Sequence, residues 1–230
     1  MVLSNYLKED KVLVAVDCII FGFYQEELKI LLAKRDFEPE KDKWSLIGGF
    51  LKKKEDLDMA ATRVLNHLTG LNNIYMEQVS TFSKVDRDPT ERTISVAYFA
   101  LIDIAHHCKD LLKQNPIKWF DLKDAPQLIF DHNAMVEKAL LILRRRAMTK
   151  PIGFELLPDK FTMRQLQKLH EAILDTKLDK RNFINKFNSQ DILKRLDEKD
   201  MSCSKKGAYL FQFDQEKYHK KLEEGFSFKI

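Results

Sequence analysis

Residues Gly48–Leu71 read GGFLKKKEDLDMAATRVLNHLTGL, which places a double glycine shortly before an amphipathic segment. The apolar residues of this segment recur at helical spacing and form one stripe. They are Leu57, Ala60, Ala61, Val64, Leu65 and Leu68. We therefore predict a helix over Leu57–Leu68. Gly70 follows this stripe and suits the left-handed position that ends many helices.

The sequence on both sides of this helix is rich in β-branched and aromatic residues, which predicts strands. The runs KVLVAVDCIIFGFY at Lys11–Tyr24 and LKILLAKR at Leu28–Arg35 are separated by a short polar turn, which favours a hairpin. Further strands are predicted at Trp44–Phe50, Ile74–Ser83, Thr93–Asp103 and Ile117–Phe120, and a helix at Asn133–Ala147. Strands interspersed with helices predict an α/β domain.

The stretch that begins at Gly48 resembles the Nudix box, in which a glycine precedes a glutamate, an arginine followed by three glutamates, and a second glycine. Trp44 also fits this family, whereas Ile47 stands where proline is usual. The residues that match the box at its spacing are Gly49, Glu55, Arg63, Leu65, Gly70 and Leu71. The order of the surrounding strands agrees over residues 10–148, so the resemblance implies a Nudix-like α/β/α sandwich.

The positions that carry the chemistry of this family differ in this chain. Nudix hydrolases hold Mg²⁺ with carboxylates at the glutamates after the arginine, and here Val64, His67 and Leu68 occupy those positions. Valine and leucine offer no ligand atom, and a neutral histidine is a poor Mg²⁺ ligand. We therefore expect no catalytic residue, no metal, no cofactor and no enzymatic activity. The alternative is an active nucleotide-diphosphate hydrolase that recruits other glutamates, namely Glu55, Glu77 or Glu91.

A pocket can remain where a reaction is lost, since the fold keeps a concave site beside this helix. Asp17 is a lone carboxylate in an apolar strand, so it is either a satisfied core residue or a residue that faces a ligand. His132 lies near the start of the last helix of the domain, where it either lines the pocket or contacts the end of the helix. The predicted ligand-binding residues are Asp17, Lys34, Arg35, Trp44, Arg87, Asp88 and His132.

Pro151 and Gly153 interrupt the pattern and predict a domain boundary. We divide the chain into residues 1–149, a ligand-sensing domain, and residues 150–230. The first part carries 22 Lys and Arg against 22 Asp and Glu, and the second carries 17 against 13. The basic excess lies wholly in the second part, which favours a polyanion as its partner.

The second part has the order helix, turn, helix and β-hairpin, which is typical of a winged helix. Thr162 and Asp179 are suited to cap helices over Met163–Leu174 and Lys180–Asn188. Strands are predicted at Asp191–Leu196 and Ala208–Phe213.

The segment FTMRQLQKLHEAILDTKLDKRNFINKF at Phe161–Phe187 resembles the winged helix of Nudix-related transcriptional regulators. A recognition helix presents its first side chains to base edges, so Arg181 can pair with guanine, and Asn182 or Asn185 with adenine. The predicted DNA-binding residues are Lys180, Arg181, Asn182, Asn185, Lys186, Lys205 and Lys206. The alternative is a protein-binding helical domain with a solvated basic helix.

The two resemblances imply a ligand-responsive transcription regulator, expected to be a repressor, that binds double-stranded DNA at a palindromic operator as a homodimer. The expected effector is a small sugar such as L-arabinose, as in the arabinose-responsive branch of the family, because no metal offsets the charge of a diphosphate. ADP-ribose is the alternative. The chain has no secretory signal that we can read and no apolar run near the roughly 20 residues that span a bilayer. Its cysteines, Cys18, Cys108 and Cys203, are expected to be free thiols, which favours a cytoplasmic location.

Overall fold

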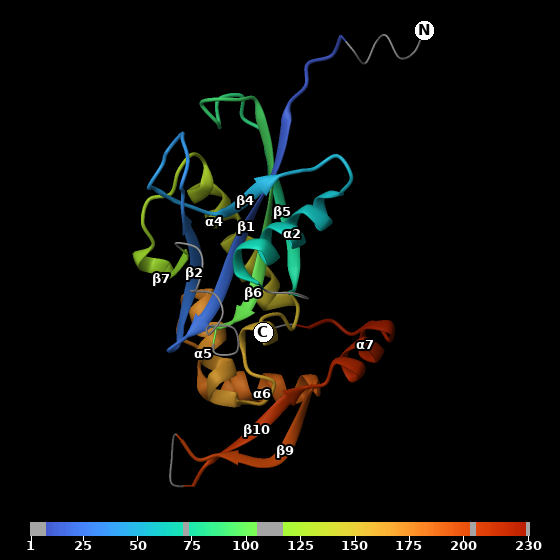
Figure 1. Ribbon diagram of the computed structural model, residues 1–230. Helices are drawn as coiled ribbons and strands as arrows, with labels where there is room; N and C mark the ends of the chain where they lie inside the picture. Colours follow the sequence, from blue (N-terminus) through green and yellow to red (C-terminus); the bar gives the residue numbers. More distant parts are fainter. Residues whose placement is uncertain (1–7, 71–73, 105–116, 203–205, 229–230) are drawn as a thin grey trace.

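The computed structural model describes residues 8–70, 74–104, 117–202 and 206–228. They form a large sheet with helices on both faces, followed by a smaller unit of helices and a β-hairpin (Figure 1). This arrangement confirms the predicted α/β sandwich with a C-terminal winged helix. No helix among these residues is long and apolar enough to cross a bilayer.

The large sheet has seven strands among the described residues, in the order β3-β2-β1-β6-β5, with β4 paired to β1 and β7 paired to β2. Strands β1 and β6 run parallel at its centre, and the other pairs are antiparallel. These two central strands are covered on both faces, which explains their continuous apolar sequence. The strands are β1 (Leu13–Tyr24), β2 (Glu27–Lys34), β3 (Trp44–Ser45), β4 (Ile47–Phe50), β5 (Met76–Phe82), β6 (Thr93–Asp103) and β7 (Ile117–Asp121).

Helices α2 (Leu57–Thr69) and α4 (His132–Thr149) lie on opposite faces of this sheet. Successive side chains of a strand point to opposite faces, so the residues of β1 divide between two cores. Ile20 packs into the core that contains α2, and Phe21 packs into the core that contains α4. The predicted helix at Leu57–Leu68 is confirmed, and Gly70 ends it in the left-handed conformation with φ 70°.

The smaller unit has the predicted order of elements and a three-stranded sheet, β8-β10-β9. Thr162 caps α5 by accepting a hydrogen bond from the backbone N–H of Gln165 (3.2 Å), and Asp179 caps α6 by accepting one from Asn182 (2.8 Å). Both predicted caps are confirmed. The elements are β8 (Phe161–Thr162), α5 (Met163–Leu174), α6 (Lys180–Gln190), β9 (Leu193–Asp200), β10 (Ala208–Phe213) and α7 (Gln215–Glu223).

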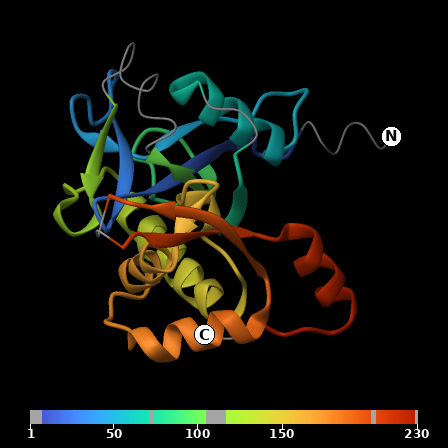
Figure 2. The ribbon, with the colours of Figure 1, turned by 90° about the horizontal axis from the view of Figure 1, so that it is seen from below.

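Two expectations about local structure were wrong, and one helix was not predicted. The strand predicted at Trp44–Phe50 is two strands with different partners, since β3 pairs with β2 and β4 pairs with β1. The strand predicted at Asp191–Leu196 begins later, because Asp191 ends α6 in the left-handed region with φ 53°. Helix α7 was not predicted, and it projects to one side of the body in both ribbon views (Figure 2).

The two parts of the chain share one continuous apolar core. Leu143 of α4 belongs to the same buried cluster as Leu169 and Ile173 of α5. The guanidinium of Arg144 also donates from Nε to the carbonyl oxygen of Ile173 (3.0 Å). Helix α4 therefore packs against the sheet and against the winged helix, and it connects the two. Two 3-10 turns, η1 (Leu122–Asp124) and η2 (Phe154–Leu156), complete the described elements.

Candidate functional site

A cavity of about 290 Å³ opens beside the double glycine, between β1, the end of β2, β4, the loop after β5 and the start of α4. Of the seven predicted ligand-binding residues, six line it: Asp17, Lys34, Arg35, Arg87, Asp88 and His132. Trp44 is not among the lining residues, and its ring instead packs edge-on against Phe120 (4.8 Å between centroids). Trp44 and Ser45 are neighbours on β3 and point to opposite faces, and it is Ser45 that lines the cavity.

A buried ionic cluster forms one wall of this cavity. Arg87, whose side chain is 3% exposed, donates from Nε and Nη2 to the carboxylate of Asp131 (3.0 and 2.7 Å). Its Nη2 also lies 3.8 Å from Asp17, which accepts a hydrogen bond from the hydroxyl of Ser95 (2.5 Å). Asp131 was missed by the sequence analysis, although it stands next to His132, which was singled out.

His132 completes the cluster from the first turn of α4. Its Nδ1 accepts a hydrogen bond from the backbone N–H of Leu46 (3.1 Å), so the ring proton belongs on Nε2, which lies 3.8 Å from Asp17. Burial lowers the pKa of His132 below its ordinary value. The ring is therefore neutral near pH 7, and Nε2–H faces the Asp17 carboxylate.

The double glycine brings the sheet close to this cluster. A Cβ added at Gly48 would lie 2.2 Å from Oδ1 of Asp17, and one added at Gly49 would lie 2.8 Å from a methyl group of Val64. Neither position has room for a side chain, which explains both glycines without reference to a phosphate.

The Nudix box itself does not form a magnesium site. Glu55 accepts two hydrogen bonds from Arg63 (2.8 and 2.5 Å), and this pairing lowers the pKa of Glu55 to about 2. Val64 is buried against Gly49, and His67 lines the cavity with a nitrogen donor. The side chain of Leu68 lies outside the described structure. The magnesium ion that the Nudix family implies therefore does not fit the donors that the chain presents here.

The glutamates of the alternative hydrolase do not gather at the cavity. Glu55 is committed to Arg63, and Glu77 forms an ion pair with Arg146 of α4. Neither these residues nor Glu91 line the cavity. Cys18 is buried and its pKa is raised to about 12 by that burial, so its thiol is unreactive. Cys108 and Cys203 lie outside the described residues.

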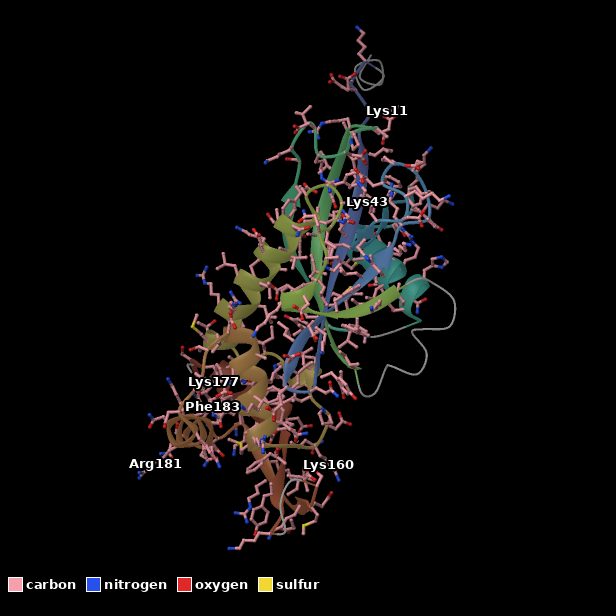
Figure 3. All side chains as sticks on the ribbon, turned by 90° about the vertical axis from the view of Figure 1, so that its left-hand side faces the viewer. Lys11, Lys43, Lys160, Lys177, Arg181 and Phe183 are labelled. Atoms are coloured by element: carbon pink, nitrogen blue, oxygen red, sulfur yellow. The ribbon has the colours of Figure 1, made fainter. Side chains whose placement is uncertain are left out.

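Helix α6 buries its phenylalanine side chains and exposes its basic and amide side chains, as a recognition helix requires. Phe183 and Phe187 are buried and pack on each other (4.8 Å between centroids). The predicted DNA-binding residues of this helix are all exposed, namely Lys180, Arg181, Asn182, Asn185 and Lys186. Figure 3 shows α6 along its axis, with Arg181 on the outer side of the helix. Lys206 is exposed on the turn between β9 and β10, and Lys205 lies outside the described residues.

The hairpin β9–β10 carries a cationic cluster that the sequence analysis missed. The guanidinium of Arg195 lies 3.7 Å from the ring centroid of Tyr209, and Nζ of Lys199 lies 4.7 Å from the same ring. The signal was present as basic residues on one strand opposite an aromatic residue on the next. The predicted strand, however, ended at Leu196 and excluded Lys199.

Two protein families match this chain over its two parts. Residues 11–140 match the family described as NUDIX domain, and residues 153–213 match the family described as NrtR DNA-binding winged helix domain. A protein of Acinetobacter baylyi, named ADPR responsive transcriptional repressor NtrR, is 31% identical over 222 residues, which are 94% of this chain and 88% of that protein.

Solved structures agree with these matches. Shewanella oneidensis NrtR complexed with a 27mer DNA superposes with a TM-score of 0.81 at 27% identity, covering 87% of this chain and 93% of that one. The NUDIX domain of the same protein complexed with ADP ribose gives a TM-score of 0.51 at 28% identity, covering 62% of this chain and 99% of that one.

Proposed function

We propose that this chain is a DNA-binding transcriptional repressor controlled by ADP-ribose. The chain belongs to the NrtR-like family of regulators, in which a NUDIX domain precedes a winged helix domain. Its NUDIX domain, within residues 1–149, binds the effector, and its winged helix, within residues 150–230, binds an operator. The comparisons give no support to the pentose effector, such as L-arabinose, that the sequence analysis favoured.

One observation carries this proposal: helix α4 begins at the cavity and ends against the winged helix. Its start holds Asp131, which precedes the helix, and His132 beside Asp17, and its last turns pack Leu143 and Ala147 into the core shared with α5. A ligand that displaces Arg87 from Asp131 thereby acts on the element that carries α5, against which the recognition helix α6 packs. Effector binding and DNA binding are then linked through a single helix.

The chemistry of the cavity supports a nucleoside diphosphate sugar. Lys34, whose Nζ lies 3.5 Å from Asp42, lines it and offers a cation for phosphate where family members use a metal. Asp17 offers a carboxylate to ribose hydroxyl groups. The named ligand of the relatives, ADP-ribose, contains both kinds of group. We expect the repressor to act as a homodimer on a palindromic site, since a two-fold protein matches a two-fold operator.

We expect Asp17→Asn to remove the response to ADP-ribose while ligand-free DNA binding stays unchanged. The variant keeps the shape of the side chain but loses the charge that faces Arg87 and the ligand. Coupling of this kind is typically about 1–3 kcal/mol, so ADP-ribose is expected to change operator affinity by about 5- to 150-fold in the wild type. The measurement is fluorescence anisotropy of a duplex that the wild type selects from a random pool, with and without ADP-ribose.

The matched control is Asp36→Asn, which removes an exposed carboxylate from the lining of the same cavity. It is expected to respond like the wild type. A full response by Asp17→Asn would show that Asp17 is only a core residue. No response by the wild type to ADP-ribose would remove ADP-ribose as the effector.

For DNA binding, we expect Arg181→Ala to cost about 1–3 kcal/mol on the selected duplex and to relax the preference at one base pair in each half-site, because Arg181 lies in the first turn of α6. Lys206→Ala is expected to weaken all duplexes alike and to reduce the log–log salt slope by about one, as for a phosphate contact. Titrations against selected and scrambled duplexes at several salt concentrations separate the two roles. Equal losses on both duplexes for Arg181→Ala would contradict base reading.

A further inference from the structure

At the mouth of the cavity a guanidinium lies close to two aromatic rings, an arrangement that the roles given so far do not explain. The guanidinium carbon of Arg35 lies 3.8 Å from the ring centroid of Phe37 and 5.5 Å from that of Phe130. Its Nε donates to the carbonyl oxygen of Phe37 (3.1 Å), which fixes the plane of the group. All three residues line the cavity.

Phe37 is exposed and Phe130 has a left-handed backbone, and neither feature stabilises the folded protein. Phe37 is 54% exposed, although a phenylalanine gains stability from burial. Phe130 has a φ of 49°, a left-handed conformation that costs a bulky residue about 1–3 kcal/mol and that gathers at ligand sites. Its neighbours hold it there, because the N–H of Ile129 donates to Trp44 and the N–H of His132 donates to Ile129 (both 3.1 Å).

The size of the cavity places part of a large ligand at this mouth. A volume of about 290 Å³ is near the lower end of the range for small-molecule sites, which is about 300–1,000 Å³. Asp17 and Arg87 are buried in the wall, whereas Phe37 is exposed at the edge. A large ligand whose polar groups contact Asp17 and Arg87 must therefore extend outwards past Phe37 and Arg35.

We propose that Arg35, Phe37 and Phe130 form a stacking site for the planar heteroaromatic ring of the effector, with its ribose and phosphate groups directed inwards. This inference rests on the proposed function and specifies which part of a nucleotide ligand the rim recognises. Bases stack on aromatic rings and on guanidinium planes whatever their hydrogen-bonding pattern. A free pentose has no aromatic ring for such a site, so the rim favours a nucleotide over a sugar.

The test compares ligands that share phosphate and ribose but differ in the base. Isothermal titration of ADP-ribose, AMP and ribose 5-phosphate is carried out with the wild type, Phe37→Ala and Phe37→Trp. Loss of one stacking contact is expected to weaken ADP-ribose and AMP by about 5- to 150-fold in Phe37→Ala, and to leave ribose 5-phosphate unchanged. Phe37→Trp is expected to bind at least as tightly as the wild type. Phe37 is exposed, so these changes do not threaten the fold.

Phe50→Ala is the matched control, because Phe50 is 51% exposed and lines the same cavity without a contact to Arg35 among the described rings. Equal weakening of ribose 5-phosphate and ADP-ribose, or no weakening of either nucleotide by Phe37→Ala, would overturn the proposal. If the wild type binds no ADP-ribose, ADP-ribose is not the effector, and the binding of AMP alone then tests the stacking site. Tighter binding of AMP to the wild type than to Phe37→Ala then supports the site, and equal or absent binding overturns it.

Discussion

Replacing Arg87 with alanine is expected to destabilise the NUDIX domain by about 3–5 kcal/mol, as is usual when one partner of a buried ion pair is removed. The side chains of Arg87, Asp17 and Asp131 are 3%, 9% and 19% exposed. Without the guanidinium, the two largely buried carboxylates lose the cation that contacts them, and Asp131 loses two hydrogen bonds. Urea denaturation of both proteins at neutral pH measures the difference in the free energy of unfolding.

Two further variants decide whether the loss comes from this cluster. Arg145→Ala removes an exposed arginine of α4 and is expected to change stability by less than about 0.5 kcal/mol. Asp131→Asn in the Arg87→Ala background is expected to recover part of the loss, because the amide carries no charge. A cost for Arg87→Ala no larger than that for Arg145→Ala would mean that the cluster contributes nothing to stability.

Local signals in the sequence were sufficient for most of the fold. The apolar stripe and Gly70 gave the limits of α2 to within one residue, and Thr162 and Asp179 gave the starts of α5 and α6, because capping is decided by residues three apart. The division of Trp44–Phe50 into β3 and β4 depends on which strands lie beside it, and no local pattern carries that information. Helix α7 escaped prediction because it has no buried residue among those described.

The site was harder to predict than the fold, because its contacts join residues that are far apart in the sequence. Arg87 was selected as a ligand contact, yet its guanidinium is held by Asp131, a residue 44 positions away in the sequence. Only the folded sheet brings the loop after β5 to the start of α4. Trp44 was predicted to line the pocket, but the alternation of a two-residue strand turns it towards Phe120. Residue type identified the pocket as a whole, while the orientation of each side chain required the structure.

The second large effect concerns His170, which is buried under the recognition helix. Its Nδ1–H donates to the carbonyl oxygen of Leu166 (2.9 Å), and its Nε2 is buried without a hydrogen-bond partner among the described residues. The ring packs edge-on against Phe183 (5.4 Å) and Phe187 (5.3 Å), the two residues that anchor α6. Burial lowers the pKa of His170 from 6.5 to about 4, because a charged imidazole has no solvation there.

A pKa that is lower in the folded state than in the unfolded state makes the unfolded chain bind protons first. The contribution of His170 to stability is therefore complete above pH 6.5 and is lost as the pH falls from 6.5 towards 4. The loss is expected to reach about 3 kcal/mol at pH 4, from 1.36 kcal/mol for each unit of pKa difference. The loss weakens the packing of α6, because His170 contacts Phe183 and Phe187.

The variant His170→Leu isolates this effect, because leucine has a similar volume, fits the apolar surroundings and does not titrate. All other titrating groups, including His132, are common to both proteins and cancel in the difference between them. Guanidinium denaturation of the two proteins at intervals from pH 7 to pH 4 gives that difference. We expect the stability of the wild type to fall relative to His170→Leu by about 3 kcal/mol over this range. A difference that stays constant from pH 7 to pH 4 would show that His170 is accommodated in its charged form, and that this residue does not make the fold sensitive to acid.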